Sequence, residues 1–169
     1  MSETILNKVS NSVLVNFDLE AYIPKGSRTF IDISQWLDQG FLLREKPFRE
    51  ALITHDWKQY STHYIALGCS TGAILPAWAS LLVTSYLQPV AKTIVLGSLV
   101  ELERQIFREM IAELDLTPFK GKPIMIKGCS DATIPQDAYI LLVQRLQSVA
   151  KSIFYGEACS SVPLWKVKK

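Results

Sequence analysis

The 169-residue sequence predicts an α/β domain with a mainly parallel sheet and helices on its faces. One observation behind this prediction is an apolar run that ends in Gly-Cys-Ser and occurs twice, at residues 64–70 and 124–130. A second is that residues 76–97 match residues 135–156 at ten of 22 positions, where unrelated stretches would share roughly one or two. These matches indicate an internal duplication, with one copy at 64–97 and the other at 124–156.

Each copy has the pattern of a strand, a cysteine loop, a helix and a second strand. Short apolar runs that end before glycine predict buried strands at 64–67, 93–96, 124–127 and 152–155. A proline followed by apolar residues at helical spacing predicts a helix after each cysteine loop. Because parallel strands joined by a helix form a right-handed crossover, we expect the loops at Cys69 and Cys129 to leave the same edge of one sheet.

Residues 1–63 contain no repeat and predict an α+β segment that flanks the sheet. Strands are expected at 13–19 and 28–33, on either side of the turn signal Pro-Lys-Gly-Ser at 24–27. Short helices are expected at 34–37 and 47–54. We interpret this segment as a layer that covers the sheet.

Residues 98–116 are the clearest helix in the sequence. Ser98 and Glu101 have capping-box spacing, and an apolar stripe at helical spacing follows them. This helix and the turn that ends at 123 connect the strand at 93–96 to the strand at 124–127, so all four strands can be parallel. The second repeat and a C-terminal cysteine tail then fill 124–169, and we expect a single domain over residues 1–169.

Composition excludes several classes of protein. A formal net charge of +2 predicts no nucleic-acid partner, and the two closing lysines are typical of a solvated tail. It has no run of about 18 apolar residues and no signal-peptide pattern at its start, so we expect no membrane association and a cytoplasmic location. In that reducing compartment, three cysteines are not expected to form disulfides.

The three cysteines are the candidate site. Cys69, Cys129 and Cys159 each follow a predicted strand and precede a serine, which predicts that they converge at one sheet edge with their sulfurs within about 10 Å of each other. An all-sulfur ligand set suits an iron–sulfur cluster or zinc. Three thiolates leave one position for a substrate, a partner's residue or a fourth ligand, for which the candidates are His55, Asp131 and Glu157.

Two other chemistries stay open. A thiol between a strand and a helix is also the arrangement of a nucleophilic cysteine, so Cys69 or Cys129 could serve a thiol-dependent enzyme or a persulfide carrier. Neither loop has an arginine six residues after the cysteine, which disfavours phosphate hydrolysis. Alternatively, the cysteines are small buried apolar residues in a protein-interaction module. His55 and His63 are more typical of structural histidines than of ligands.

Several phrases of the sequence resemble a bacterial family known as domain of unknown function 2480. The phrases that carry the resemblance are 12–20, 55–57, 68–70, 127–131 and 149–164. Ala158 stands where the family pattern has proline, and the cysteine spacing is unchanged. The family has no established activity, but the resemblance implies an association with the sulfur-mobilisation machinery that builds iron–sulfur clusters. It therefore implies an accessory role in cluster assembly or sulfur handling, with iron–sulfur assembly proteins as partners.

Overall fold

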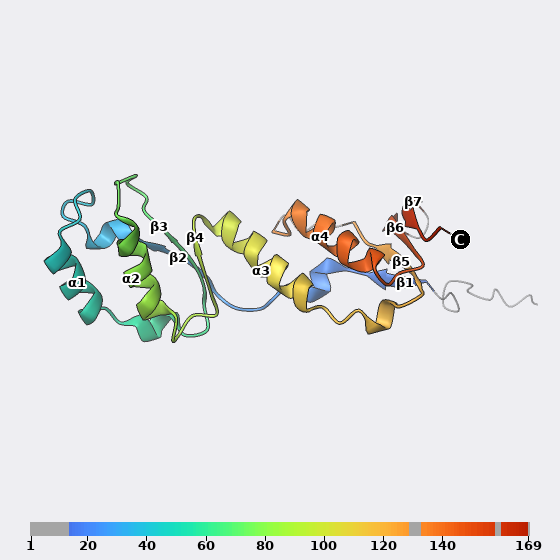
Figure 1. Ribbon diagram of the computed structural model, residues 1–169, viewed down its shortest axis with the longest axis horizontal. Coiled ribbons are helices and arrows are strands. Elements are labelled where there is room, and N and C mark those ends of the chain that lie inside the picture. The colour runs from blue at the N-terminus through green and yellow to red at the C-terminus, as the bar shows by residue number, and fades with distance from the viewer. Residues whose placement is uncertain (1–13, 129–132, 158–159, 169) are drawn as a thin grey trace, which may run out of the picture. The chain divides into compact units, whose positions relative to one another are not determined.

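The computed structural model describes residues 14–128, 133–157 and 160–168, and the chain forms two compact units (Figure 1). The inserted unit comprises residues 24–107, and the terminal unit comprises residues 1–23 and 108–169. The boundary between Phe107 and Arg108 falls inside the helix α3 (Leu99–Glu113). Each unit contains its own sheet, so each is described by itself below.

The inserted unit is built on a three-stranded parallel sheet. The strands β2 (Arg28–Asp32), β3 (Tyr64–Gly68) and β4 (Thr93–Leu96) lie in that order, with β3 in the middle. Between β2 and β3 the chain forms the 3-10 helix η2 (Ile33–Trp36), the helix α1 (Glu45–Thr54) and the 3-10 helix η3 (Trp57–Tyr60). The helix α2 (Ala77–Leu87) connects β3 to β4.

The alternation of side chains along β3 explains how helices cover both faces of this sheet. Ile65 and Leu67 point to one face, where they join the core formed with Phe48 of α1 and Val83 of α2. Ala66 points to the other face and packs against the first half of α3. All of these residues are fully buried or nearly so, and the unit therefore has helices on both faces of a parallel sheet.

The terminal unit repeats the parallel arrangement and adds one antiparallel strand. Its sheet has the order β1 (Val15–Phe17), β5 (Pro123–Ile126), β6 (Ser152–Glu157) and β7 (Ser160–Lys166). The first three strands are parallel, and β7 runs antiparallel to β6. The 3-10 helices η1 (Leu19–Tyr22) and η4 (Thr117–Phe119) and the helix α4 (Gln136–Gln147) complete the unit.

The α/β class with parallel strands is confirmed, but the prediction of one sheet is wrong. The sequence predicts β3, β4 and β5 in one sheet, whereas β4 pairs with β3 in one sheet and β5 lies in the other. The physical reason is that β3 and β5 each have an edge already filled by a strand from the N-terminal segment. β2 pairs with β3 over five residues, and β1 pairs with β5 over three.

The same pairings correct the interpretation of residues 1–63 as a layer outside the sheet. Phe17 of β1 and Ile31 of β2 are 1% and 2% exposed, which shows that these strands belong to the cores of the two units. The cysteine tail also differs from the prediction, because β7 forms a hairpin with β6. The predictions of a single domain over 1–169 and of an internal duplication stay predictions.

Helix boundaries were predicted closely. The helix expected at 98–116 spans Leu99–Glu113, and Ser98 and Glu101 make the expected capping interactions. α1 begins at Glu45, so Pro47 lies in its first turn, where the absence of an N–H removes no helical hydrogen bond. Among the described residues, the helices are all too short or too polar to cross a membrane.

Candidate functional site

The loop at Cys69 leaves the carboxyl end of β3, the middle strand of the inserted unit. β3 ends at Gly68, and α2 begins at Ala77 with Pro76 as its N-cap residue. The side chain of Cys69 is half-buried and packs against the core that α1 and α2 cover. In open parallel sheets, ligands bind outside the carboxyl ends of the strands, so this thiol occupies a position typical of functional residues.

Asp32, the last residue of β2, holds this loop in place. Its Oδ1 accepts hydrogen bonds from the backbone N–H of Ser70 at 3.1 Å and of Ser34 at 2.9 Å, and its Oδ2 accepts one from the Ser70 hydroxyl. Burial raises the pKa of the Asp32 carboxyl, but the hydrogen bonds from Ser70 and Ser34 outweigh it and lower the pKa to about 2. The carboxylate therefore fixes both the cysteine loop and the start of η2.

Thr71 makes a second tether and determines how the thiol is hydrogen-bonded. Its hydroxyl donates to the Gly40 carbonyl at 2.6 Å, and its Oγ1 lies 3.3 Å from the Cys69 sulfur. Because a hydroxyl has one proton, the thiol must be the donor in its contact with Thr71. This arrangement therefore suits the protonated thiol, and a thiolate would need the Thr71 hydroxyl to turn away from Gly40.

Two glycines permit this close packing. A Cβ on Gly68 would come within 2.8 Å of the Phe30 ring, so this side chain of β2 packs directly against the end of β3. Gly40 has a φ of 78°, a conformation that side chains other than glycine rarely adopt.

The carboxyl edge of the terminal unit has a different polar contact. Asp18, which follows β1, accepts a hydrogen bond from the Lys127 ammonium at 3.0 Å and caps η1 through the N–H of Glu20. The hydrogen bond from Lys127 lowers the pKa of Asp18, and the same bond raises the pKa of Lys127. Here a surface ion pair takes the place that the Asp32–Ser70 contact has in the inserted unit.

Of the three predicted ligands, the structure places Cys69, whereas Cys129 and Cys159 lie outside the described residues. The prediction that all three follow strands of one sheet is wrong. Cys69 follows β3, whereas β5 and β6, which precede the other two cysteines in the sequence, are neighbours in the other sheet. The predicted spacing of the sulfurs stays a prediction, and the described residues include no group of three His, Cys, Asp or Glu side chains that could hold a metal ion.

The structure describes two of the three predicted fourth ligands, His55 and Glu157, and the remaining histidine, His63. His55 Nε2 lies 3.2 Å from the Tyr60 hydroxyl, and its ring packs edge-on against Trp36, as expected of a structural histidine. His63 Nδ1 lies 2.9 Å from the Thr29 hydroxyl, near the start of β3. Glu157 is the last residue of β6, and Asp131 lies outside the described residues.

Sequence reasoning missed Asp32 and Thr71, although one signal for Asp32 was present. Aspartates lie near the ends of both predicted N-terminal strands, at 18 and 32, in similar contexts of apolar residues. An aspartate directly after a buried strand is well placed to accept hydrogen bonds from neighbouring loops. The Thr71 tether to Gly40 had no such signal, since it joins loops 31 residues apart.

Comparison with known proteins identifies a family without assigning an activity. A family model described as a protein of unknown function (DUF2480) matches residues 3–167. No curated protein and no solved structure matches the chain.

Proposed function

Since this chain belongs to the DUF2480 family of unknown function, we propose that its role depends on its cysteines. In this proposal the protein is a cytoplasmic accessory factor in iron–sulfur cluster assembly or sulfur handling. It binds a metal ion or cluster through Cys69, Cys129 and Cys159, and iron–sulfur assembly proteins are its partners.

The observation that carries the proposal is the position of Cys69. The thiol lies at the carboxyl end of the central strand of a parallel sheet, half-buried, in a loop that Asp32 holds through hydrogen bonds from Ser70. A cysteine needed only for packing requires no such tethers, whereas a ligand or reactive group benefits from a fixed position. The sulfur is also the ligand that zinc and iron–sulfur clusters prefer.

A correspondence between the units supports extending the proposal to Cys129, on the basis that the units are duplicated copies. The Lys92 N–H donates to the His63 carbonyl at 2.8 Å, and 59 residues later the Lys151 N–H donates to the Lys122 carbonyl at 2.9 Å. The Asp56 and Asp115 carboxylates, also 59 residues apart, each accept from the N–H two residues on. In this proposal Cys129 follows β5 as Cys69 follows β3.

The test is metal analysis of protein purified without oxygen. We expect iron with acid-labile sulfide, or zinc, in stoichiometric amount, and a large loss on replacing any one of Cys69, Cys129 and Cys159 with serine, because an incomplete ligand shell binds weakly. Ser85→Ala, on the exposed side of α2, is the matched control and should retain the metal. Full occupancy in all three cysteine variants would refute ligation by these thiols.

A persulfide carrier is the second candidate. The partial exposure of Cys69 favours it, because a carrier needs an accessible thiol. In that reaction the Cys69 thiolate attacks the outer sulfur of a donor persulfide, the donor's sulfur–sulfur bond breaks, and the donor leaves as a thiolate. Alkylation at neutral pH separates the candidates, because a carrier should be labelled at one cysteine far faster than at the other two. If neither metal binding nor selective labelling is found, the interaction-module alternative is favoured.

A further inference from the structure

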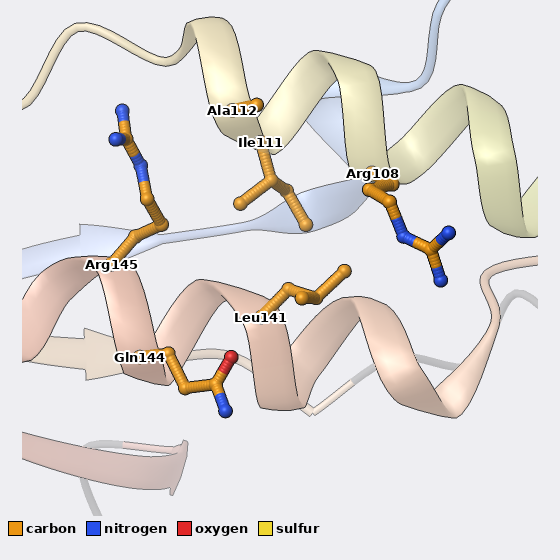
Figure 2. Close-up of a pocket in the computed structure, with 6 residues that line it drawn as sticks. All are labelled: Arg108, Ile111, Ala112, Leu141, Gln144 and Arg145. Carbon is orange, nitrogen blue, oxygen red and sulfur yellow. The ribbon is translucent and has the colours of Figure 1, made fainter.

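A pocket lies between the end of α3 and α4, within the terminal unit (Figure 2). Its volume is about 240 Å³, and it is lined by Arg108, Ile111, Ala112, Leu141, Gln144 and Arg145. Figure 2 shows Ile111 and Leu141 pointing toward each other between the two helices, with the two arginines on either side of them. The pocket therefore has an apolar centre and cationic ends, and it is smaller than the roughly 300 to 1,000 Å³ of most ligand sites.

Among the described residues, Arg145 of this pocket has no carboxylate partner. Its Nη2 donates to the Leu114 carbonyl at 3.1 Å, which is the contact that anchors the side chain. Its Nε is buried and has no hydrogen-bond partner, and no carboxylate among the described residues forms an ion pair with it. Partly buried cations are normally paired, because an N–H of a charged group without an acceptor is costly.

The inserted unit shows that this hollow is not a necessary result of the helix packing. Residue 86 precedes Arg145 by 59 positions and is a tyrosine, whose ring stacks on Trp57 with centroids 5.3 Å apart. The Trp57 indole also donates to the Leu52 carbonyl of α1 at 2.8 Å, so it fills the space between the 3-10 helix, α1 and α2. The terminal unit has Leu116 at the position 59 residues after Trp57, together with Arg145.

The lining identifies the class of ligand. A guanidinium presents N–H groups in a planar fork that matches a carboxylate, and a single uncompensated arginine suits a single negative charge. The walls made by Ile111, Ala112 and Leu141 favour an apolar body and disfavour a strongly hydrated dianion. Phosphate sites instead gather backbone N–H groups at helix N-termini, and this pocket lies along the sides of α3 and α4.

We propose that the pocket between α3 and α4 binds a small organic monocarboxylate, with its carboxylate at Arg145 and its apolar body between Ile111 and Leu141. This site is independent of the cysteines. The proposed site gives the terminal unit a small-molecule binding role. The inserted unit cannot have that role at the equivalent position, because Trp57 and Tyr86 fill the space there.

The experiment is a titration of the full chain with hexanoate, followed by NMR of the arginine Nε–H groups and by calorimetry. We expect saturable binding with a Kd on the order of 1 mM, as suits a ligand of this size, and a selective shift of the Arg145 Nε–H signal. Hexanol, which has the same chain without the charge, should bind at least about tenfold more weakly because charged hydrogen bonds are the stronger ones.

Two variants and a control complete the test. Arg145→Met keeps an apolar stem and should weaken hexanoate at least about tenfold, while Leu116→Trp should block binding by filling the pocket as Trp57 does in the inserted unit. Arg104→Met, on the exposed side of α3 and outside the pocket, should bind as the unaltered chain does. Unchanged hexanoate affinity in Arg145→Met, equal affinity for hexanol, tighter binding of hexyl phosphate, or an unshifted Arg145 Nε–H signal in the unaltered chain would each overturn the proposal.

Discussion

The two units share a parallel three-strand arrangement but use their side chains differently. In the inserted unit, Trp57 stacks on Tyr86 beside α1 and α2, and Asp32 fixes the cysteine loop through Ser70. In the terminal unit, Arg145 borders a pocket between α3 and α4. An ion pair there joins Asp18, which follows β1, to Lys127, which follows β5. The difference indicates that closely packed aromatic side chains stabilise the inserted unit, whereas the terminal unit leaves space for a ligand.

The largest expected effect is a loss of stability in the aromatic core of the inserted unit. Phe48 is fully buried, and its ring contacts Trp36 and Trp78 with centroids 6.4 and 5.9 Å apart. Phe48→Ala should lower the free energy of unfolding by about 3 to 5 kcal/mol, measured by urea denaturation, because it leaves a cavity. Ile53→Ala, on the same helix but 69% exposed, should change it by less than about 0.5 kcal/mol. A similar effect of the two substitutions would contradict the assignment of stability to this cluster.

Next in size is the contrast between Asp18, which follows β1, and Asp32, which is the last residue of β2. Asp32→Ala removes three hydrogen bonds to a carboxylate and should cost about 2 to 3 kcal/mol. Asp18→Ala removes one cap and an ion pair whose side chains are 34% and 41% exposed, and should cost about 1 kcal/mol. Urea denaturation of both variants measures the difference, and equal costs would show that Asp32 does not hold the loop.

Much of the fold follows from local patterns, and the errors arise where pairing depends on distant residues. The strands β3, β4 and β5 were predicted to within about a residue of their observed bounds, because each is a short apolar run that ends near a glycine. The pairing of β1 with β5 joins Val15 to Ile124, and no local pattern encodes a contact over that separation. β7 was not predicted; it contains Pro163, which an edge strand tolerates.

The candidate site was predictable in its cysteine but not in its surroundings. The glycine before Cys69 and the helix pattern after it predict that this cysteine lies at the carboxyl end of a strand. The contacts of Asp32 and Thr71 depend on which strand neighbours β3, and the predicted topology had omitted β2 from the sheet. Arg145 escaped notice because a polar residue beside an apolar helical stripe is ordinarily exposed, and only the packing of α3 against α4 makes it part of a pocket.

A smaller effect is expected from pH, through Asp32. In the folded state, hydrogen bonds from Ser70 and Ser34 stabilise the ionised carboxylate and lower its pKa from 3.8 to about 2. The unfolded chain therefore takes up the proton first as the pH falls. The stabilisation is therefore fully present above about pH 4 and is lost as the pH falls to about 2. The stability gap between the unaltered chain and Asp32→Asn should narrow over this range in urea denaturation. Ser70→Ala, which removes a hydrogen bond to the carboxylate, should show a weaker pH dependence, and a gap that stays constant would contradict the lowered pKa.

The smallest expected effect concerns the Cys69 thiol. It tests whether the hydrogen bonds of Thr71 or the packing against the core limits access to this thiol. Thr71→Val keeps the volume of the side chain but removes both the bond to the Gly40 carbonyl and the acceptor of the Cys69 thiol proton. Stability should fall by only about 1 kcal/mol, as for a typical hydrogen bond. The rate of Cys69 alkylation by iodoacetamide should rise a few-fold, because the loop opens more often and the thiol proton is no longer held. Peptide mapping by mass spectrometry assigns the label to Cys69, and Ser85→Ala serves as the control. An unchanged or slower rate would mean that packing against the core, and not Thr71, limits access to this sulfur.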